Sequence, residues 1–288
     1  MIVSQKADAI TRIDLPDFKA GWKQRILFLS DVHKDSMFCD DKLLKKHLDE
    51  AKDTNAIILT AGDIFDGMQG HNDPRRSYKE LKSSQKGIDY FDRILDEAYE
   101  FFKPYKDNLA LAGYGNHEYS IVHFNGTDLV QRFVGLMRAI GSPIVTGGYG
   151  GFVRIGVYND NMTTPKDSLR IYYNHGGGGE APVTKGMIQT NRQSAYIRGA
   201  NIIWNGHNHQ EYISHQSTIE ITNKDRVVQG MVTFIRTPGY KNEYGDATHG
   251  FNGFAASRMM APTPRGCAWG ELSCCDYKIA GKYTADVV

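Results

Sequence analysis

An alternation of short apolar runs with an amphipathic segment most constrains the fold of this chain. Residues 25–30 and 56–60 have the length and apolar character of buried strands. Residues 40–52 lie between them and repeat their apolar side chains at helical spacing, with Asp40 or Asp41 as a plausible cap. A strand, a helix and a second strand in this order predict a βα unit that leads into a parallel sheet. We therefore expect an α/β fold.

The same kind of pattern continues along the chain. We expect further helices over residues 88–102 and 129–140. Further strands are expected over residues 108–113, 152–158, 169–173, 200–205, 211–221 and 226–236. Residues 238–266 show no reliable period and are interpreted as a loop or lid, and residues 267–283 as a final edge strand. Residues before 25 are interpreted as a polar leader, and residues 1–288 as a single domain.

Charge and cysteine content narrow the class of protein. The chain of 288 residues has 34 Lys plus Arg against 33 Asp plus Glu, so no overall positive field indicates nucleic acid or an anionic membrane. Four cysteines, of which Cys274 and Cys275 are adjacent, do not resemble a secreted disulfide framework. Charged residues interrupt the first twenty positions, and no uncharged run could span a bilayer. We expect a cytoplasmic protein without a membrane partner.

Side chains of the metal-binding type follow one predicted strand after another. They are Asp31, His33, Asp63, Asn116, His175, His207 and His209. Asp31 and His33 are two residues apart and would point the same way in an extended segment. Gly62-Asp63 alone would be an ordinary turn, but the other six residues favour a ligand. Because the carboxyl ends of strands in such sheets converge, we expect all seven in one crevice.

Seven oxygen and nitrogen ligands are more than one cation needs. Two-metal sites suit phosphoester chemistry, because the ions can position water, polarise the phosphate and neutralise the leaving oxygen. No cysteine lies near these positions, which argues against structural zinc and favours Mn, Fe, Zn or Mg.

Five short motifs together resemble those of a known family. Asp31-Val32-His33, Gly62-Asp63, Gly115-Asn116-His117-Glu118, His175 and Gly206-His207-Asn208-His209 are similar, in this order, to the motifs of the calcineurin-like metallophosphoesterases. The resemblance covers roughly residues 26–210. It implies a two-sheet β-sandwich flanked by helices, an αββα arrangement, with a dinuclear metal site at the strand carboxyl ends.

The resemblance also implies a role for each ligand. Asp31, His33, Asp63 and His209 would bind the first metal. Asp63, Asn116, His175 and His207 would bind the second, so that Asp63 bridges the two ions. The cofactors would be two divalent metal ions, with Mn expected first and Fe, Zn, Ni or Mg as alternatives.

His117 has a separate role by resemblance. It would contact the phosphate and act as the general acid that protonates the departing oxygen, after in-line attack by a metal-bridging water or hydroxide. The alternative is a histidine that only supports a ligand through a hydrogen bond. Glu118 would either orient His117 or cap the helix that follows.

The substrate is less sharply indicated. Ser/Thr protein phosphatases of this superfamily carry an arginine just after their Gly-Asp-x-x-Asp stretch, whereas Gly67 and Met68 follow Asp66 here. The stretch looks more like the nuclease subunits of double-strand-break repair, although those usually have Asp where Glu118 stands and carry longer capping regions. Candidate substrate-binding residues are Arg75, Arg76 and Asn208. The basic loop that holds the two arginines also contains Lys79, Lys82 and Lys86. The late loop offers Tyr240, Lys241, Asn242 and His249 as further candidates. The basic residues could equally serve only to solubilise their loop.

Three functions fit these observations. The first is a metal-dependent phosphodiesterase or nuclease, whose partner would be nucleic acid or a nucleotide. The second is a phosphomonoesterase acting on a nucleotide, a protein or a small phosphate. The third is a catalytically silent metal-binding scaffold, which ranks last because the chain keeps every ligand and the proton donor.

Overall fold

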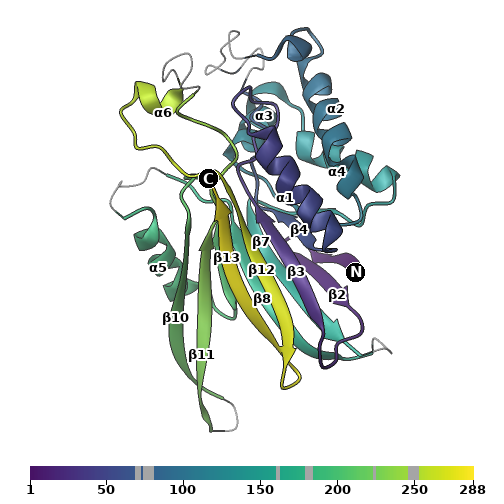
Figure 1. The fold of residues 1–288 in the computed structure, drawn as a ribbon, viewed down its shortest axis with the longest axis vertical. Helices are drawn as coiled ribbons and strands as arrows, with labels where there is room; N and C mark the ends of the chain where they lie inside the picture. Colours follow the sequence, from purple (N-terminus) through teal and green to yellow (C-terminus); the bar gives the residue numbers. More distant parts are fainter. Residues whose placement is uncertain (69–72, 74–80, 160–162, 179–183, 223–224, 246–252) are drawn as a thin grey trace.

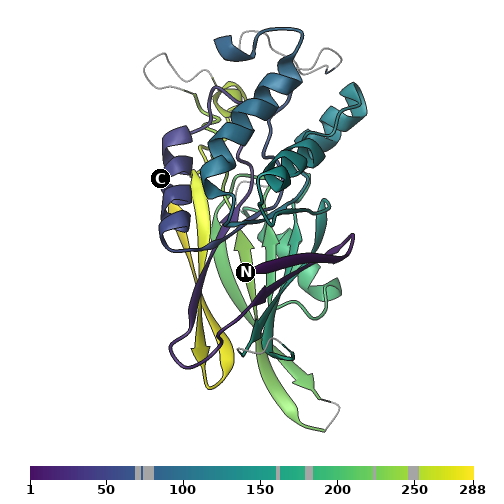
Figure 2. The same ribbon diagram turned by 90° about the vertical axis from the view of Figure 1, so that its right-hand side faces the viewer.

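Two β-sheets with helices outside them make up the protein in a computed structural model (Figures 1 and 2). The structure describes residues 1–68, 73, 81–159, 163–178, 184–222, 225–245 and 253–288. Buried side chains from both sheets form one core between the sheets, and a second core lies between the six-stranded sheet and α1, α2 and α4. The α/β class and the two-sheet sandwich flanked by helices are confirmed.

The seven-stranded sheet has the order β1-β2-β7-β8-β9-β11-β10. Its strands are β1 (Ile2–Ala7), β2 (Ile10–Leu15), β7 (Gly150–Tyr158), β8 (Pro165–Asn174), β9 (Ile202–Asn205), β10 (Tyr212–Ile221) and β11 (Val227–Arg236). The six-stranded sheet has the order β13-β12-β3-β4-β5-β6. Its strands are β3 (Lys23–Leu29), β4 (Ile57–Thr60), β5 (Leu109–Ala112), β6 (Val145–Thr146), β12 (Gly266–Cys275) and β13 (Lys278–Val287).

The α-helices are α1 (Asp41–Asp53), α2 (Tyr90–Phe102), α3 (Asn116–Asn125), α4 (Leu129–Ala139), α5 (Met187–Tyr196) and α6 (Phe254–Ser257). Short 3₁₀-helices span Ser83–Gln85 and Lys103–Tyr105. Asp40 caps α1 by accepting a hydrogen bond from the backbone N–H of Leu43 at 3.1 Å. The predicted strand–helix–strand unit is therefore present, and β3, β4, β5 and β6 pair in parallel.

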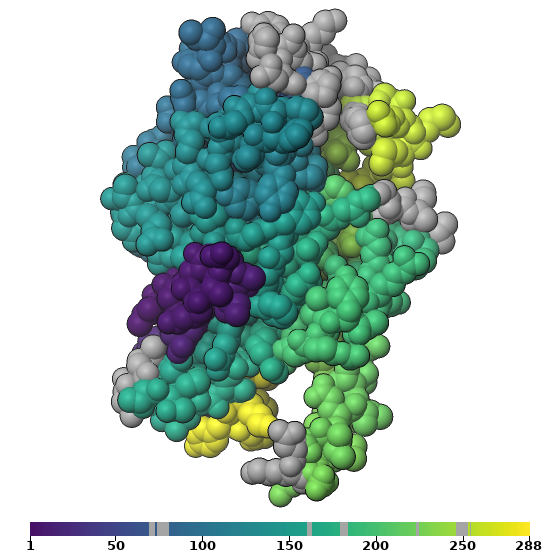
Figure 3. Space-filling model, turned by 180° about the vertical axis from the view of Figure 1, so that it is seen from behind, coloured from purple at the N-terminus to yellow at the C-terminus, as the bar shows by residue number. Residues whose placement is uncertain are grey.

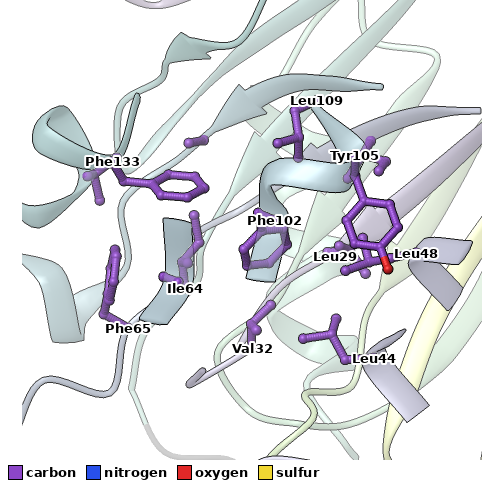
Figure 4. Close-up of a cluster of buried hydrophobic side chains, with 14 of the residues drawn as sticks. Leu29, Val32, Leu44, Leu48, Ile64, Phe65, Phe102, Tyr105, Leu109 and Phe133 are labelled. Atoms are coloured by element: carbon purple, nitrogen blue, oxygen red, sulfur yellow. The ribbon is translucent and has the colours of Figure 1, made fainter. Parts of the chain in front are cut away.

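The central strands are apolar on both faces because both faces are covered. In β3, Ile26 and Phe28 point into the core between the sheets, whereas Leu27 and Leu29 point toward the helices. Figure 4 shows the helix-side core, and among its residues are Val32, Ile64 and Phe65, which lie beyond the ends of β3 and β4. These buried side chains hold in place the loops that carry the predicted ligands.

The interpretation of the first residues as a polar leader is wrong. They form the β1–β2 hairpin, and β2 pairs in parallel with β7. In Figure 3 the N-terminal residues, in purple, lie on the surface of the molecule. Within β2 only Thr11, Ile13 and Leu15 are buried. This alternation of buried and exposed residues is too short and too polar to be recognised in the sequence.

The sequence analysis also missed the helices α3, α5 and the short α6, and misjudged the last segment. In α3 only Glu118 and Ile121 are buried, and in α5 only Thr190, so neither helix has an apolar stripe that periodicity could reveal. The expected single edge strand over residues 267–283 is instead the β12–β13 hairpin. In it β12 lies between β3 and β13, and β13 forms the edge.

Candidate metal centre

All seven predicted ligands lie where strands end. Asp31 and His33 follow β3, Asp63 follows β4, and Asn116 begins α3 shortly after β5. His175 directly follows β8 in the other sheet, and His207 and His209 follow β9. The structure therefore brings together side chains from both sheets, as expected for converging carboxyl ends.

The backbone at these ligands is not extended, contrary to the expectation for Asp31 and His33. Five of the seven ligands have positive φ, namely Asp31 (52°), His33 (48°), Asp63 (52°), His207 (76°) and His209 (52°). Left-handed residues other than glycine are uncommon, although Asp, Asn and His tolerate the conformation best. Repeated use of this conformation turns each side chain back over the end of its strand, and such strain is typical of functional sites.

Glycines beside the ligands permit close approach of neighbouring loops. Gly62 has φ of +91°, and a Cβ there would lie 2.5 Å from the backbone of Tyr114 and Gly115. A Cβ on Gly115 would lie 2.0 Å from Oδ1 of Asp63. Larger residues would therefore separate the loop after β4 from the loop after β5.

The first group of side chains contains Asp31, His33 and His209, with donor atoms within 4.8 Å of one another. His209 Nε2 lies 3.4 Å from Asp31 Oδ1. His33 Nδ1 lies 3.0 Å from Oδ1 of Asp66, which leaves its Nε2 facing Asp63 Oδ2 at 4.0 Å.

The second group contains Asp63, His175 and His207. His175 Nε2 lies 3.1 Å from Asp63 Oδ2 and 3.0 Å from Asn116 Oδ1, and His207 Nδ1 lies 2.8 Å from the same amide oxygen. Asp63 adjoins both groups, which is the position a bridging carboxylate requires.

Charges in this buried cluster offset one another. Burial alone would raise the pKa of the Asp63 carboxyl, but His175 and His117 beside it hold that pKa well below its usual range. Burial alone would lower the pKa of His175, but Asp63 and Asp31 raise it to about 10. Burial lowers the pKa of His33 to about 4, so its imidazole is neutral and can donate a lone pair.

These side chains fit divalent cations. His33 Nε2 is buried and has no hydrogen-bond partner among the residues that the structure describes, although it points into a cluster of carboxylates. Neutral imidazole nitrogens, carboxylates and one amide oxygen make a donor set for Mn, Fe or Zn rather than for a thiolate-bound structural ion. Bound cations would take over from protonated imidazoles as counter-charges to the carboxylates.

His117 is placed differently from the seven ligands. Its Nδ1–H donates to the backbone carbonyl of Asp66 at 2.7 Å, and its Nε2 lies 3.8 Å from Asp63 Oδ2. The ring is partly exposed toward a cavity of about 750 Å³ that Asp63 and Asn116 also line. A proton on Nε2 would therefore face the space in which a substrate would lie.

Glu118 holds the backbone around Asp63. Its carboxylate accepts hydrogen bonds from the N–H groups of Asp63 (2.9 Å), Gly115 (2.8 Å) and Phe65 (3.1 Å). The side chain is buried, and its burial together with Asp63 raises its pKa to about 8. Of the two roles expected from the sequence, these contacts support the cap of the following helix, because Gly115 is the residue before α3.

Replacing Glu118 with Gln should lower the free energy of unfolding of the metal-free protein by about 1–3 kcal/mol. The amide NH₂ would face at least one backbone N–H that now has a carboxylate oxygen. Urea denaturation measures the change, and the exposed Glu100→Gln on α2 is the matched control. Equal stability of Glu118→Gln and the wild-type protein would contradict a stabilising role for the hydrogen bonds between Glu118 and these backbone N–H groups.

The late loop contributes Lys241, Glu243, Ser257 and Arg258 to the lining of the cavity. Phe38 and Met68 also line it, together with five of the seven ligands. Lys241 Nζ donates to Asp66 Oδ1 at 2.7 Å, and Glu243 Oε1 lies 3.5 Å from His209 Nδ1. The sequence suggested Lys241 as one of several late-loop candidates, but nothing local marks Glu243, which is 34 positions from His209.

The described candidates Lys82 and Asn208 do not line the cavity. Arg75, Arg76, Lys79 and His249 lie outside the described residues. Lys82 Nζ donates to Glu97 Oε1 at 2.7 Å, so its charge is already paired. Asn208 lies between His207 and His209 and does not line the cavity, and its Nδ2 has no hydrogen-bond partner within the described part of the chain.

Comparisons with known proteins give one family. A model of the calcineurin-like phosphoesterases matches residues 24–213, and no curated protein matches the sequence. Among solved structures, vacuolar protein sorting 29 from Cryptosporidium parvum is 12% identical, with 93% of this chain and 100% of that chain covered and a TM-score of 0.39. A metallophosphoesterase from Sphaerobacter thermophilus is also 12% identical, with coverage of 91% and 88% and a TM-score of 0.35. GAP50 of Plasmodium is 13% identical, with coverage of 91% and 84% and a TM-score of 0.40.

Proposed function

The chain belongs to the calcineurin-like phosphoesterases and is thus a metal-dependent phosphoester hydrolase, and from this premise we propose that its substrate is a phosphodiester. Nucleic acid or a nucleotide is the proposed source of that diester. The proposed ligands are Asp31, His33, Asp63 and His209 for one metal, and Asp63, Asn116, His175 and His207 for the other. Manganese is the proposed metal, with Fe, Zn, Ni and Mg as alternatives.

The charge of the cavity beyond the ligands supports a diester over a monoester. Lys241 is already paired with Asp66, and the Glu243 carboxylate lines the same cavity as Arg258. A phosphomonoester is largely a dianion at neutral pH, whereas a diester carries one negative charge. The second charge of a monoester would meet the Glu243 carboxylate, and Lys241, the one lysine in the cavity lining among the described residues, is already paired with Asp66.

The shape and chemistry of the cavity agree with a diester's two organic groups. Its volume of about 750 Å³ is typical of pockets that take a small organic molecule. Phe38 and Met68 offer apolar surface beside the ligands. A nucleotide unit combines a phosphate with an aromatic base, whose face can stack on a side chain such as that of Phe38.

Each residue then has a defined part in hydrolysis. Two bound cations would supply Lewis acidity, which withdraws charge from the phosphoryl oxygens and lowers the pKa of the attacking water. Asp63 would hold the two cations, and its Oδ1 accepts a hydrogen bond from the backbone N–H of His117 at 3.0 Å. His117 holds a proton at Nε2 and gives it to the leaving oxygen, while its Nδ1–H stays bonded to the Asp66 carbonyl.

A reducing compartment such as the cytoplasm is part of the proposal. All four cysteines are free thiols in the structure, and Cys267 is buried. Among the described residues, no helix has the length and apolar character needed to cross a membrane.

A substrate panel tests this proposal. The Mn-loaded protein should hydrolyse bis(para-nitrophenyl) phosphate at least about tenfold faster than para-nitrophenyl phosphate at equal concentration, because the second charge of the monoester faces Glu243. A tenfold ratio of rates corresponds to about 1.4 kcal/mol in activation free energy. The panel also contains a cyclic nucleotide and single- and double-stranded DNA, each assayed with Mn, Ni, Zn and Mg. Preference for the monoester would support the phosphatase alternative. Cleavage of the small diester with both DNA forms intact would exclude a nuclease.

A further inference from the structure

A short segment of the late loop forms one wall of the metal centre. This wall segment, residues 239–243, lies beyond the part of the chain that the family model matches. Its Tyr240 N–H donates to the Asp31 carbonyl at 2.9 Å and its Tyr240 carbonyl accepts from Asp40 at 2.8 Å, while Asn242 N–H donates to Phe38 at 2.8 Å. The wall segment is thus bound along its length to the loop that carries Asp31 and His33.

Side-chain contacts fix the wall segment further. Tyr240 is fully buried, and its hydroxyl lies 2.8 Å from Nδ1 of His47 on α1. The other ring nitrogen of His47 lies 3.3 Å from Asp286 on β13. A Cβ on Gly239 would lie 2.7 Å from the Asp31 carbonyl oxygen, so the backbone passes the ligand loop as closely as glycine allows.

From this fixed backbone, Glu243 reaches one of the ligands. Its Oε1 lies 3.5 Å from Nδ1 of His209, whose Nε2 faces Asp31 Oδ1 at 3.4 Å. His209 Nδ1 is buried and has no hydrogen-bond partner in the described part of the chain, so the Glu243 carboxylate is the acceptor that faces it. His175 differs, because its Nδ1 donates to the neutral carbonyl of Ala61 at 2.8 Å.

A carboxylate behind a ligating imidazole holds its tautomer and its orientation and makes it a stronger donor. His33 has Asp66 in that position, but Asp66 is itself paired with Lys241 of the wall segment. The group of Asp31, His33 and His209 therefore has carboxylates behind both of its histidines, whereas His175 in the other group has none.

We propose that Glu243 is a positioning residue for His209, and that it selectively strengthens metal binding by the group of Asp31, His33 and His209. This inference rests on the metal centre of the proposed function. It assigns the late loop a part in building the centre, in addition to lining the cavity.

Manganese titration of the wild-type protein and Glu243→Gln tests this inference. Calorimetry gives the dissociation constant of each of two sites, and electron paramagnetic resonance distinguishes a spin-coupled Mn pair from a single Mn ion. Glu243→Gln should bind one Mn about 10- to 100-fold more weakly, with the other dissociation constant nearly unchanged. At intermediate Mn, its spectrum should show single ions where the wild-type protein shows the coupled pair.

Two further variants serve as controls. Glu243→Asp keeps the charge and should recover part of the lost affinity, which a purely structural role would not require. Glu220→Gln removes an exposed carboxylate on β10 and should titrate like the wild-type protein. Two wild-type dissociation constants in Glu243→Gln would overturn the inference but leave the proposed function intact. Failure of the wild-type protein to bind two ions would instead overturn the metal centre itself, and the inference with it.

Discussion

Replacement of Asp63 by Asn is expected to lower turnover by at least about 10³-fold and to reduce the metal content of the protein at the same time. Asp63 is buried, adjoins both groups of candidate ligands, and lies 3.1 Å from His175 and 4.0 Å from His33 through one carboxylate oxygen. An amide keeps the size of the side chain but removes the negative charge that two cations would share. Both effects should therefore appear together.

Metal analysis and the rate of diester hydrolysis on the same preparation test this prediction. The matched control is Asp53→Asn at the exposed end of α1, which should keep both properties. If the Asp63→Asn protein retained two ions and wild-type turnover, the bridging role of Asp63 would be contradicted. Loss of activity with full metal content would instead place Asp63 in positioning the substrate or His117.

Replacement of His117 by Ala is expected to lower turnover by about 10²- to 10⁴-fold without loss of metal. The size of the loss should depend on the leaving group, because a general acid matters most where the departing oxygen is strongly basic. Hydrolysis of a diester with a nitrophenolate leaving group should therefore suffer much less than hydrolysis of an alkyl or nucleoside diester. This dependence separates proton donation from a general disturbance of the site.

His123→Ala on the exposed side of the same helix is the control and should behave like the wild-type protein. His117 also lies near His33 and Asp63 in a third group of possible metal-binding side chains, so a ligand role is the rival explanation. Loss of metal from His117→Ala would favour that rival. An equal loss of rate for good and poor leaving groups would also contradict the general-acid role.

The sequence predicted the candidate ligands because each follows a strand whose apolar residues are recognisable by themselves. Val32, Ile64 and Phe65 belong to the helix-side core, so the loops that carry the candidate ligands are continuous with that core (Figure 4). The local geometry was predicted less well. Asp31 and His33 were expected in an extended segment, but both have positive φ, which the apolar pattern of the preceding strand does not reveal.

Features that depend on contacts between distant residues escaped prediction. Glu118 binds three backbone N–H groups that converge only after β4 and β5 pair. Glu243 meets His209 because the wall segment is fastened to the loop after β3, about 200 positions earlier in the chain. The polar β1–β2 hairpin forms a sheet edge mainly through backbone pairing, which leaves little trace in hydrophobic periodicity.

The most direct test of the central claim is a metal titration of activity. Protein stripped of metal by a chelator is mixed with increasing Mn²⁺, and the hydrolysis of bis(para-nitrophenyl) phosphate is followed together with bound Mn per chain. We predict no hydrolysis in the stripped protein and full activity when two ions are bound per chain. Hydrolysis that survives complete removal of metal, or that reaches its maximum with only one ion bound, would contradict the dinuclear centre.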